Sequence, residues 1–176
     1  HEGYIIAWRS LTSATNRRTM LATLLPLIPT CQSIQILQLD NIDDMLQILV
    51  LFNSIIFDYI VRLKMAGLDL TQTIIKQIPV PKKEIYESVI VFQDKEDTIR
   101  NHVYARIKYL YAKDKRVSAL FENNDICDST KKSRKQIISE LDCLVGAMYG
   151  LSTEQIKEIA STFDKYYTKK EVEQWF

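Results

Sequence analysis

The sequence contains few of the residues that build nucleotide-binding and catalytic sites. Glycine occupies only 4 of 176 positions, and neither a G-x-x-x-x-G-K-[ST] loop nor a G-x-G-x-x-G loop is present. Such loops need glycine because the backbone approaches phosphate closely, so a nucleotide cradle is not indicated. The 2 histidines are His1 and His102, and we expect His102 on a helix surface. No catalytic constellation and no metal site is therefore identified.

Cysteine is scarce as well. Cys31, Cys127 and Cys143 lie far apart in the chain and form no C-x-x-C pair. Disulfide frameworks and zinc sites need even numbers or close spacings, so neither is indicated. The pattern is typical of reduced, structural thiols, and we predict a cytoplasmic protein.

Long hydrophobic runs are missing too. The most apolar stretch, residues 45–57, carries no charge but contains Gln47, Asn53 and Ser54. A membrane span needs about 20 apolar residues, so this stretch is too short and too polar, and we expect no membrane association. No signal peptide is recognisable, and the chain opens on His1, which suggests a cut within a longer protein.

Acidic residues are absent from residues 3–39, which contain Arg9, Arg17 and Arg18. Carboxylates repel a phosphate backbone, so an acid-free stretch with arginines favours a nucleic-acid partner. Arg17 and Arg18 are surrounded by the amide of Asn16 and by several hydroxyls, a mixture that suits phosphate and base-edge contacts. An ordinary solvated polar loop explains the same composition. The net charge of +1 excludes a strongly basic DNA-coating protein.

The composition, 47% hydrophobic and 26% charged, is typical of a globular domain. Residues 4–8, 19–25 and 33–39 read as β-strands, and Pro26 and Pro29 interrupt the chain between the second and third. A long, largely buried helix is predicted over residues 42–63, with Asn41 as its N-cap and Gly67 after its end. Residues 68–81 form a connector, closed by two prolines.

The remainder of the chain is predicted to be helical. Apolar stripes mark helices over residues 96–112 and 132–149, and we expect the two to pack as an antiparallel pair. Gly150 should end the second of them. Capping boxes at Ser152 and Thr168 should open two short helices. Between the pair, residues 113–131 are polar, with a turn signal at residues 123–125.

These elements predict a helix-dominated α+β fold. A short β-containing N-terminal part packs on the long buried helix, and a C-terminal helical pair with short terminal helices follows. We place the boundary at the connector, which gives a recognition part over residues 1–81 and a helical spacer or docking part over residues 82–176.

Three segments together resemble a known family. Residues 51–62 contain N-S-x-x-F-D-Y and are followed by G-L-D-L at residues 67–70 and Q-I-P-V-P at residues 77–81. Upstream, R-T-M-L-A at residues 18–22 precedes Pro26, and downstream L-D-C-L-V-G-A-M-Y-G-L-S covers residues 141–152. In this order, the segments resemble the C-terminal target-recognition and helical region of type IIG restriction–modification enzymes, which contain an adenine-specific DNA methyltransferase. Type I specificity subunits are similar in looser form.

The resemblance covers about residues 8–163 and implies a role in DNA recognition. The family's catalytic [DN]-P-P-[YF] motif and its glycine-rich S-adenosylmethionine loop are missing from the chain. The resemblance therefore implies a recognition fragment without catalysis or cofactor, from a bacterial or archaeal phage-defence enzyme. The parent's missing domain would bind S-adenosylmethionine and methylate adenine, with or without an endonuclease activity in the parent. Its partners would be double-stranded DNA and that methyltransferase domain, in the same chain or in a partner subunit.

Eight side chains are candidates for DNA contacts. Arg17 and Arg18 come first, although Arg18 matches a family strand in which its role is equally well structural. Asn16 suits an adenine edge, and Asp69 and Gln72 follow Gly67 on a turn that either reads base edges or merely reverses the chain. Phosphate clamps are expected at three further positions: Arg9, Lys64 and Lys76. The basic run at residues 131–135 is interpreted as a solvated helix start.

Two alternatives remain open. The helical part, with aromatic residues near its end, suits a protein–protein docking module without direct DNA contact. A small enzyme of unknown type is the other alternative, against which the missing nucleophile–base pair and cofactor loop argue.

Overall fold

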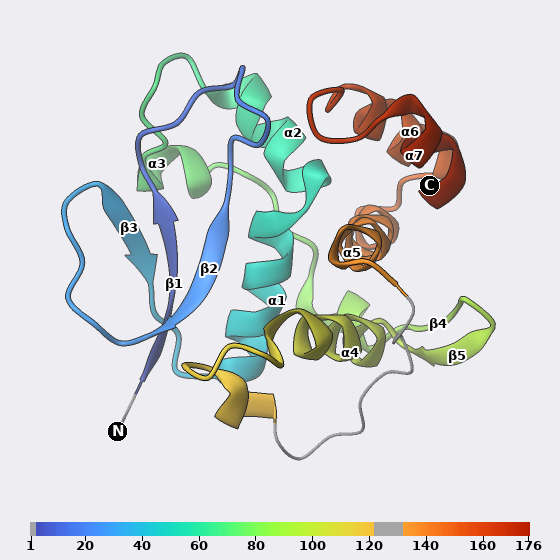
Figure 1. Ribbon diagram of the computed structural model, residues 1–176, viewed down its shortest axis with the longest axis horizontal. Helices are drawn as coiled ribbons and strands as arrows, with labels where there is room; N and C mark the ends of the chain where they lie inside the picture. The colour runs from blue at the N-terminus through green and yellow to red at the C-terminus, as the bar shows by residue number, and fades with distance from the viewer. Residues whose placement is uncertain (1–2, 122–131) are drawn as a thin grey trace.

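The computed structural model describes residues 3–121 and 132–176 (Figure 1). Over these residues the chain adopts the predicted helix-dominated α+β fold, in which α-helices outnumber the strands of two small sheets. The turn predicted at residues 123–125, together with Cys127 and Lys131, lies outside the described residues.

The first sheet contains the three predicted strands. It is antiparallel with the order β2-β1-β3, built from β1 (Tyr4–Arg9), β2 (Ala22–Pro26) and β3 (Ile34–Leu37). β1 is central, and its Ile5, Ile6, Ala7 and Trp8 are all buried. In Figure 1 β1 rises from the N-terminus, so the loop after it lies at the top of the molecule.

The predicted long helix is in fact two helices. α1 (Ile42–Asn53) and α2 (Ile55–Lys64) are bent by 65° at Ser54, whose backbone is extended. The Ser54 hydroxyl accepts a hydrogen bond from Phe57 N at 3.1 Å, so Ser54 acts as the N-cap of α2. Asn41 caps α1 as predicted, through bonds from the backbone of the first turn. The bend turns α2 toward the top of the molecule (Figure 1).

The stretch after the connector corrects the prediction of an all-helical remainder. α3 (Gln72–Ile75) lies within the connector and a 3-10 helix η1 (Lys83–Glu87) follows it. An antiparallel hairpin, β4 (Val89–Phe92) and β5 (Lys95–Thr98), then precedes the next helix. Its turn residues, Gln93 and Asp94, have φ values of 53° and 61°. These residues stand where such turns usually have Asn-Gly, so a local pattern did not predict the turn.

The next two helices bury the predicted stripes. α4 (Ile99–Tyr111) and α5 (Arg134–Met148) pack against each other and against α1, and a 3-10 helix η2 (Ser118–Phe121) follows α4. Figure 1 shows α4 lying across the view while α5 is seen nearly end-on, so the pair crosses steeply instead of lying antiparallel. A steep crossing still buries both apolar stripes, because α4 and α5 each pack on α1 as well as on each other.

The C-terminal helices begin as predicted. α6 (Thr153–Ser161) and α7 (Lys169–Trp175) each open with a complete capping box, at Ser152 and Thr168. Gly150 has a φ of 71° and ends α5, a conformation that favours glycine. A capping box at Ser133, which the sequence analysis did not identify, opens α5.

One hydrophobic core connects the two predicted parts. A single cluster of buried residues extends from Ile6 in β1 to Val172 in α7 and crosses the boundary at residue 81. The boundary therefore does not separate two cores, and as a division of function it stays a prediction. Within the described residues, no single helix combines the length and apolar character that a membrane span requires.

Candidate nucleic-acid interface

Arg18 anchors the loop that follows β1. Its side chain is only 4% exposed, and its Nε lies 2.7 Å from Oδ2 of Asp58, a carboxylate with no exposed surface. A terminal nitrogen of Arg18 also donates to the carbonyl of Asn53 at 2.7 Å. Asp58 accepts a further hydrogen bond from Thr19 N, at 3.0 Å. A buried charge is tolerated only when it is paired and hydrogen-bonded, and this arrangement provides both.

Burial of Arg18 favours the structural one of its two expected roles. Its guanidinium is directed inward and is bonded to Asp58 and to the carbonyl of Asn53. Arg62, which the sequence analysis did not select, lies one helical turn beyond Asp58, and its Nε is 3.4 Å from Oδ1 of that carboxylate. Arg62 also donates to the carbonyl of Asn16 at 2.9 Å, which ties the loop after β1 to α2.

The three segments that carry the family resemblance meet at this network. The side-chain amide of Asn53 pairs with the backbone of Ala22 in β2, accepting from its N and donating to its O at 3.1 and 2.9 Å. Oδ1 of Asp142 in α5 accepts from Ile55 N at 2.9 Å, and Tyr167 donates to Oδ2 at 2.7 Å. Polar residues of these segments therefore hold strand, helix and helix together.

Burial sets the ionisation of this network. Burial alone would lower the pKa of Arg18, but the carboxylates of Asp58 and Asp142 outweigh it and raise that pKa. Burial raises the pKa of Asp142 to about 6, although Arg18 and the Tyr167 hydroxyl oppose the change. Burial also raises the pKa of Tyr167, so its hydroxyl stays protonated and remains a donor to Asp142.

Four of the predicted contact residues gather at one exposed hollow. Arg9, Asn16, Arg17 and the buried Arg18 line it, together with Leu21 and Tyr166. The side chains of both Arg9 and Arg17 are exposed, and neither forms an ion pair within the described part of the chain. The Arg17 guanidinium carbon lies 5.4 Å from the centre of the Tyr166 ring, a cation–π contact that orients it. The structure thus brings together two cations and an amide from separate elements.

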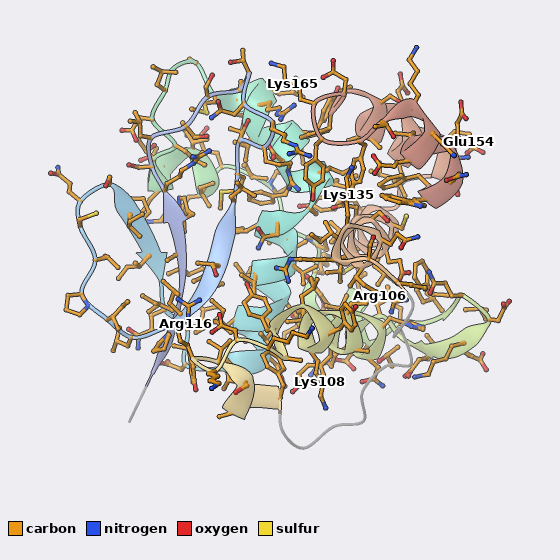
Figure 2. All side chains as sticks on the ribbon, in the orientation of Figure 1. Arg106, Lys108, Arg116, Lys135, Glu154 and Lys165 are labelled. Atoms are coloured by element: carbon orange, nitrogen blue, oxygen red, sulfur yellow. The ribbon has the colours of Figure 1, made fainter. Side chains whose placement is uncertain are left out.

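A second, neighbouring hollow is formed where the C-terminal part reaches the same loop. Lys165 donates through Nζ to the carbonyl of Thr15 at 2.9 Å, and Figure 2 shows Lys165 at the upper edge of the molecule. Arg17, Arg62 and Lys165 all line this hollow, with Asp164 as the acidic member. Nothing in the local sequence pattern around Lys165 indicated this contact, which joins residues 150 positions apart.

Asp69 and Gln72 lie at a separate hollow beside the end of β1. Leu11 and Asp69 form an isolated antiparallel bridge, and Leu70 N donates to the carbonyl of Ser10 at 2.7 Å. The connector therefore runs alongside the extension of β1, with Asp69 and Gln72 exposed next to Gln35 and Ser33. This hollow does not include Arg9 or Arg17.

The two predicted lysine clamps are exposed at the ends of helices. Lys64 is the last residue of α2, and Lys76 is the C-cap of α3. Neither lysine forms a salt bridge among the described residues, and neither lines the hollow of Arg9 and Arg17. Both elements lie in the upper part of Figure 1, on the same end of the molecule as the loop after β1.

The histidine and the basic run that the sequence analysis considered are buried or paired within the fold. His102 is buried against Phe92, with ring centres 5.8 Å apart, which corrects the expectation of a helix-surface histidine. Of the basic run at the start of α5, Lys132 pairs with Glu140 and Lys135 with Glu171. Among the described residues, no group of three histidine, cysteine or carboxylate side chains is placed to hold a metal ion.

Comparisons with protein-family models, with curated proteins and with solved structures found no match to this chain.

Proposed function

We propose that the chain recognises DNA as a fragment of a restriction–modification enzyme of the adenine-methyltransferase type. The hollow formed by Arg9, Asn16 and Arg17 carries the proposal. Arginine donates to phosphate oxygens or to a guanine edge, and an asparagine amide suits an adenine edge. These three side chains therefore have the donors and acceptors that contacts to a duplex require.

The frame beneath the hollow supports this role. The backbone that carries Asn16 and Arg17 is fixed by Arg62 and Lys165 and by the buried pair of Arg18 and Asp58. Contact residues held in this way lose little conformational freedom on binding, which favours recognition. Lys64, Lys76, Asp69 and Gln72 are exposed around the same end of the molecule and complete the proposed surface.

On this proposal the chemistry belongs to another domain. S-adenosylmethionine and the adenine would bind in the methyltransferase domain implied by the resemblance, while this chain holds the flanking duplex. Enzymes that modify a base extrude it from the stack, so they need such a clamp on the surrounding DNA.

The salt dependence of duplex binding tests the proposal. Each phosphate neutralised by an arginine or lysine contributes about −0.9 to the slope of log Kobs against log salt concentration. Arg17→Gln should lower the magnitude of the slope by about one if it contacts phosphate, or should relax one base preference if it contacts a base. Retention of both slope and preference in Arg17→Gln and in Arg9→Gln would contradict the assignment.

A docking role is the second candidate, and exposed leucines favour it. Leu11, Leu63 and Leu68 are 67%, 71% and 62% exposed in and near the connector. Apolar side chains at such exposure suit a protein interface. This candidate predicts association with the partner domain that hardly changes with salt and that Leu63→Gln weakens.

A further inference from the structure

An apolar pocket in the centre of the molecule adjoins the proposed DNA surface and shares Arg18, Leu21 and Tyr166 with its hollow. It has a volume of about 220 Å³ and lies between β2, α1, α4 and α5. In Figure 1 these four elements border the middle of the ribbon. The pocket walls are aliphatic and come from all three helices: Leu49, Val50, Ile107, Leu110, Ile138 and Leu141.

Such a pocket has the size and polarity for a small organic ligand. An apolar cavity of roughly 150 Å³ stays dry and binds benzene, so the present pocket has room for a ring with a short chain. Unfilled apolar space also weakens a core, because the lining atoms lack partners for dispersion contacts. A ligand that fills the pocket should therefore stabilise the fold.

The polar groups of the pocket select the charge of that ligand. Arg18 and Arg134 both line it, together with the hydroxyl-bearing Tyr111 and Tyr166. Among the described residues, no carboxylate lines the pocket. Arg18 is held rigidly by Asp58 and by the Asn53 carbonyl, which fixes its guanidinium in the pocket wall.

Arg134, the first residue of α5, provides the second cation. It is exposed, and one of its terminal nitrogens donates to the carbonyl of Leu110 at 2.8 Å. This bond fixes the guanidinium beside the pocket and leaves its other nitrogen atoms available. Guanidinium groups pair well with carboxylates, since they offer two parallel N–H donors.

We propose that this pocket binds a compact apolar carboxylate, with its hydrocarbon part among the aliphatic walls and its carboxylate toward Arg134. The proposal does not depend on DNA binding. A ligand here would contact β2 and the helices that support the loop after β1, but it would leave Arg9 and Arg17 free.

Three probes that share one hydrocarbon part test the proposal: 4-phenylbutyrate, 4-phenyl-1-butanol and 4-phenylbutylamine. Titrated into the 176-residue chain by calorimetry, the carboxylate should bind at least tenfold more tightly than the amine, with the alcohol between them. Amide shifts in NMR spectra should map to the pocket walls. No saturable binding of the carboxylate, or equal binding of the amine, would overturn the proposal.

Two variants of the pocket and one control variant show where the probes bind. Arg134→Gln should weaken the carboxylate about tenfold and change the alcohol less than twofold, whereas Lys95→Gln, on the hairpin, should change neither. Ala22→Leu adds carbon atoms to the pocket wall in β2 and should abolish binding of all three probes, provided that its melting curve stays cooperative. Unchanged carboxylate affinity in both Arg134→Gln and Ala22→Leu would place the probe elsewhere and contradict the proposal.

Discussion

Asp58 is the residue on which the candidate interface depends most directly. Its carboxylate has no exposed surface and accepts hydrogen bonds from Arg18 and from the backbone of Thr19. Arg62 approaches the other carboxylate oxygen at 3.4 Å. One buried side chain in α2 therefore fixes the two residues that follow Arg17, and it pairs with Arg62, which holds the carbonyl of Asn16.

Asp58→Asn should destabilise the fold strongly. The substitution leaves the buried Arg18 guanidinium without its nearest counter-charge, and removal of one partner of a buried ion pair costs about 3–5 kcal/mol. Urea unfolding monitored by circular dichroism measures the change. Glu173→Gln, an exposed carboxylate near the C-terminus, is the control and should stay within about 0.5 kcal/mol of the wild type. A loss below about 1 kcal/mol in Asp58→Asn would show that the pair is not structural.

Asp142 should make stability depend on pH. Its pKa is raised from 3.8 to about 6 by burial, so the folded state keeps a proton that the unfolded chain releases. The stabilisation from this proton is complete below about pH 4 and is lost as the pH rises through about 6. At about 1.4 kcal/mol per pKa unit, the loss amounts to about 3 kcal/mol.

Asp142→Asn isolates this effect, because the amide oxygen can still accept from Ile55 N. The unfolding free energy of the wild type minus that of the variant should fall between pH 4 and pH 7. Urea titrations at several pH values give this difference. A difference that is constant, or that rises with pH, would contradict the assignment.

At the scale of elements, the contact between α5 and α6 depends on Gly146. A Cβ placed there would lie 2.4 Å from Cδ1 and 2.6 Å from Cγ1 of the buried Ile156. Gly146→Ala should therefore cost about 1–3 kcal/mol by overpacking, despite the better helix propensity of alanine. Thermal unfolding measures the loss.

Gly67 provides the matched control for this prediction. No atom lies within 4 Å of a Cβ placed at Gly67, so Gly67→Ala should be neutral or slightly stabilising. Combining Gly146→Ala with Ile156→Ala should cost less than the sum of the two single changes, since the second removes the clashing atoms. Additive losses would argue that Gly146 is needed for another reason.

Local signals in the sequence predicted those elements whose ends are determined by neighbouring residues. The caps at Asn41, Ser152 and Thr168 each use partners within three residues, and all three were predicted and confirmed. The bend at Ser54 was not predicted. Besides the cap at Ser54, the bend is held by Asp142, which accepts a hydrogen bond from Ile55 N. These two residues are 87 positions apart, so a local pattern cannot predict the contact.

The hairpin and the site show the same limit. The turn at Gln93 and Asp94 lacks glycine and asparagine, so the predicted helix began at residue 96, whereas residues 96–98 belong to β5. The composition around Arg17 and Arg18 suggested one basic patch, but only the partner Asp58, 40 positions away, determines which arginine is buried. Arg9, Asn16 and Arg17 were predicted individually, while their convergence on one hollow required the fold.

At the scale of the whole molecule, the single core joins the sheet to the C-terminal helices. Lys165 and Tyr166 follow α6 and contact the loop after β1, so the predicted spacer region contributes to the proposed DNA surface. We therefore expect recognition to need residues on both sides of position 81.

Duplex binding of two variants that carry the same net charge decides whether Arg9 and Arg17 contact DNA. Arg9→Gln/Arg17→Gln alters the proposed hollow, whereas Lys113→Gln/Lys115→Gln alters exposed lysines in the segment after α4, at the opposite end of the molecule (Figure 1). Fluorescence anisotropy at several salt concentrations gives each slope. If Arg9 and Arg17 contact phosphate, the slope should be smaller in magnitude by about two in the first variant and unchanged in the second. Equal slopes in the wild type and both variants, or no duplex binding at low salt, would contradict this contact.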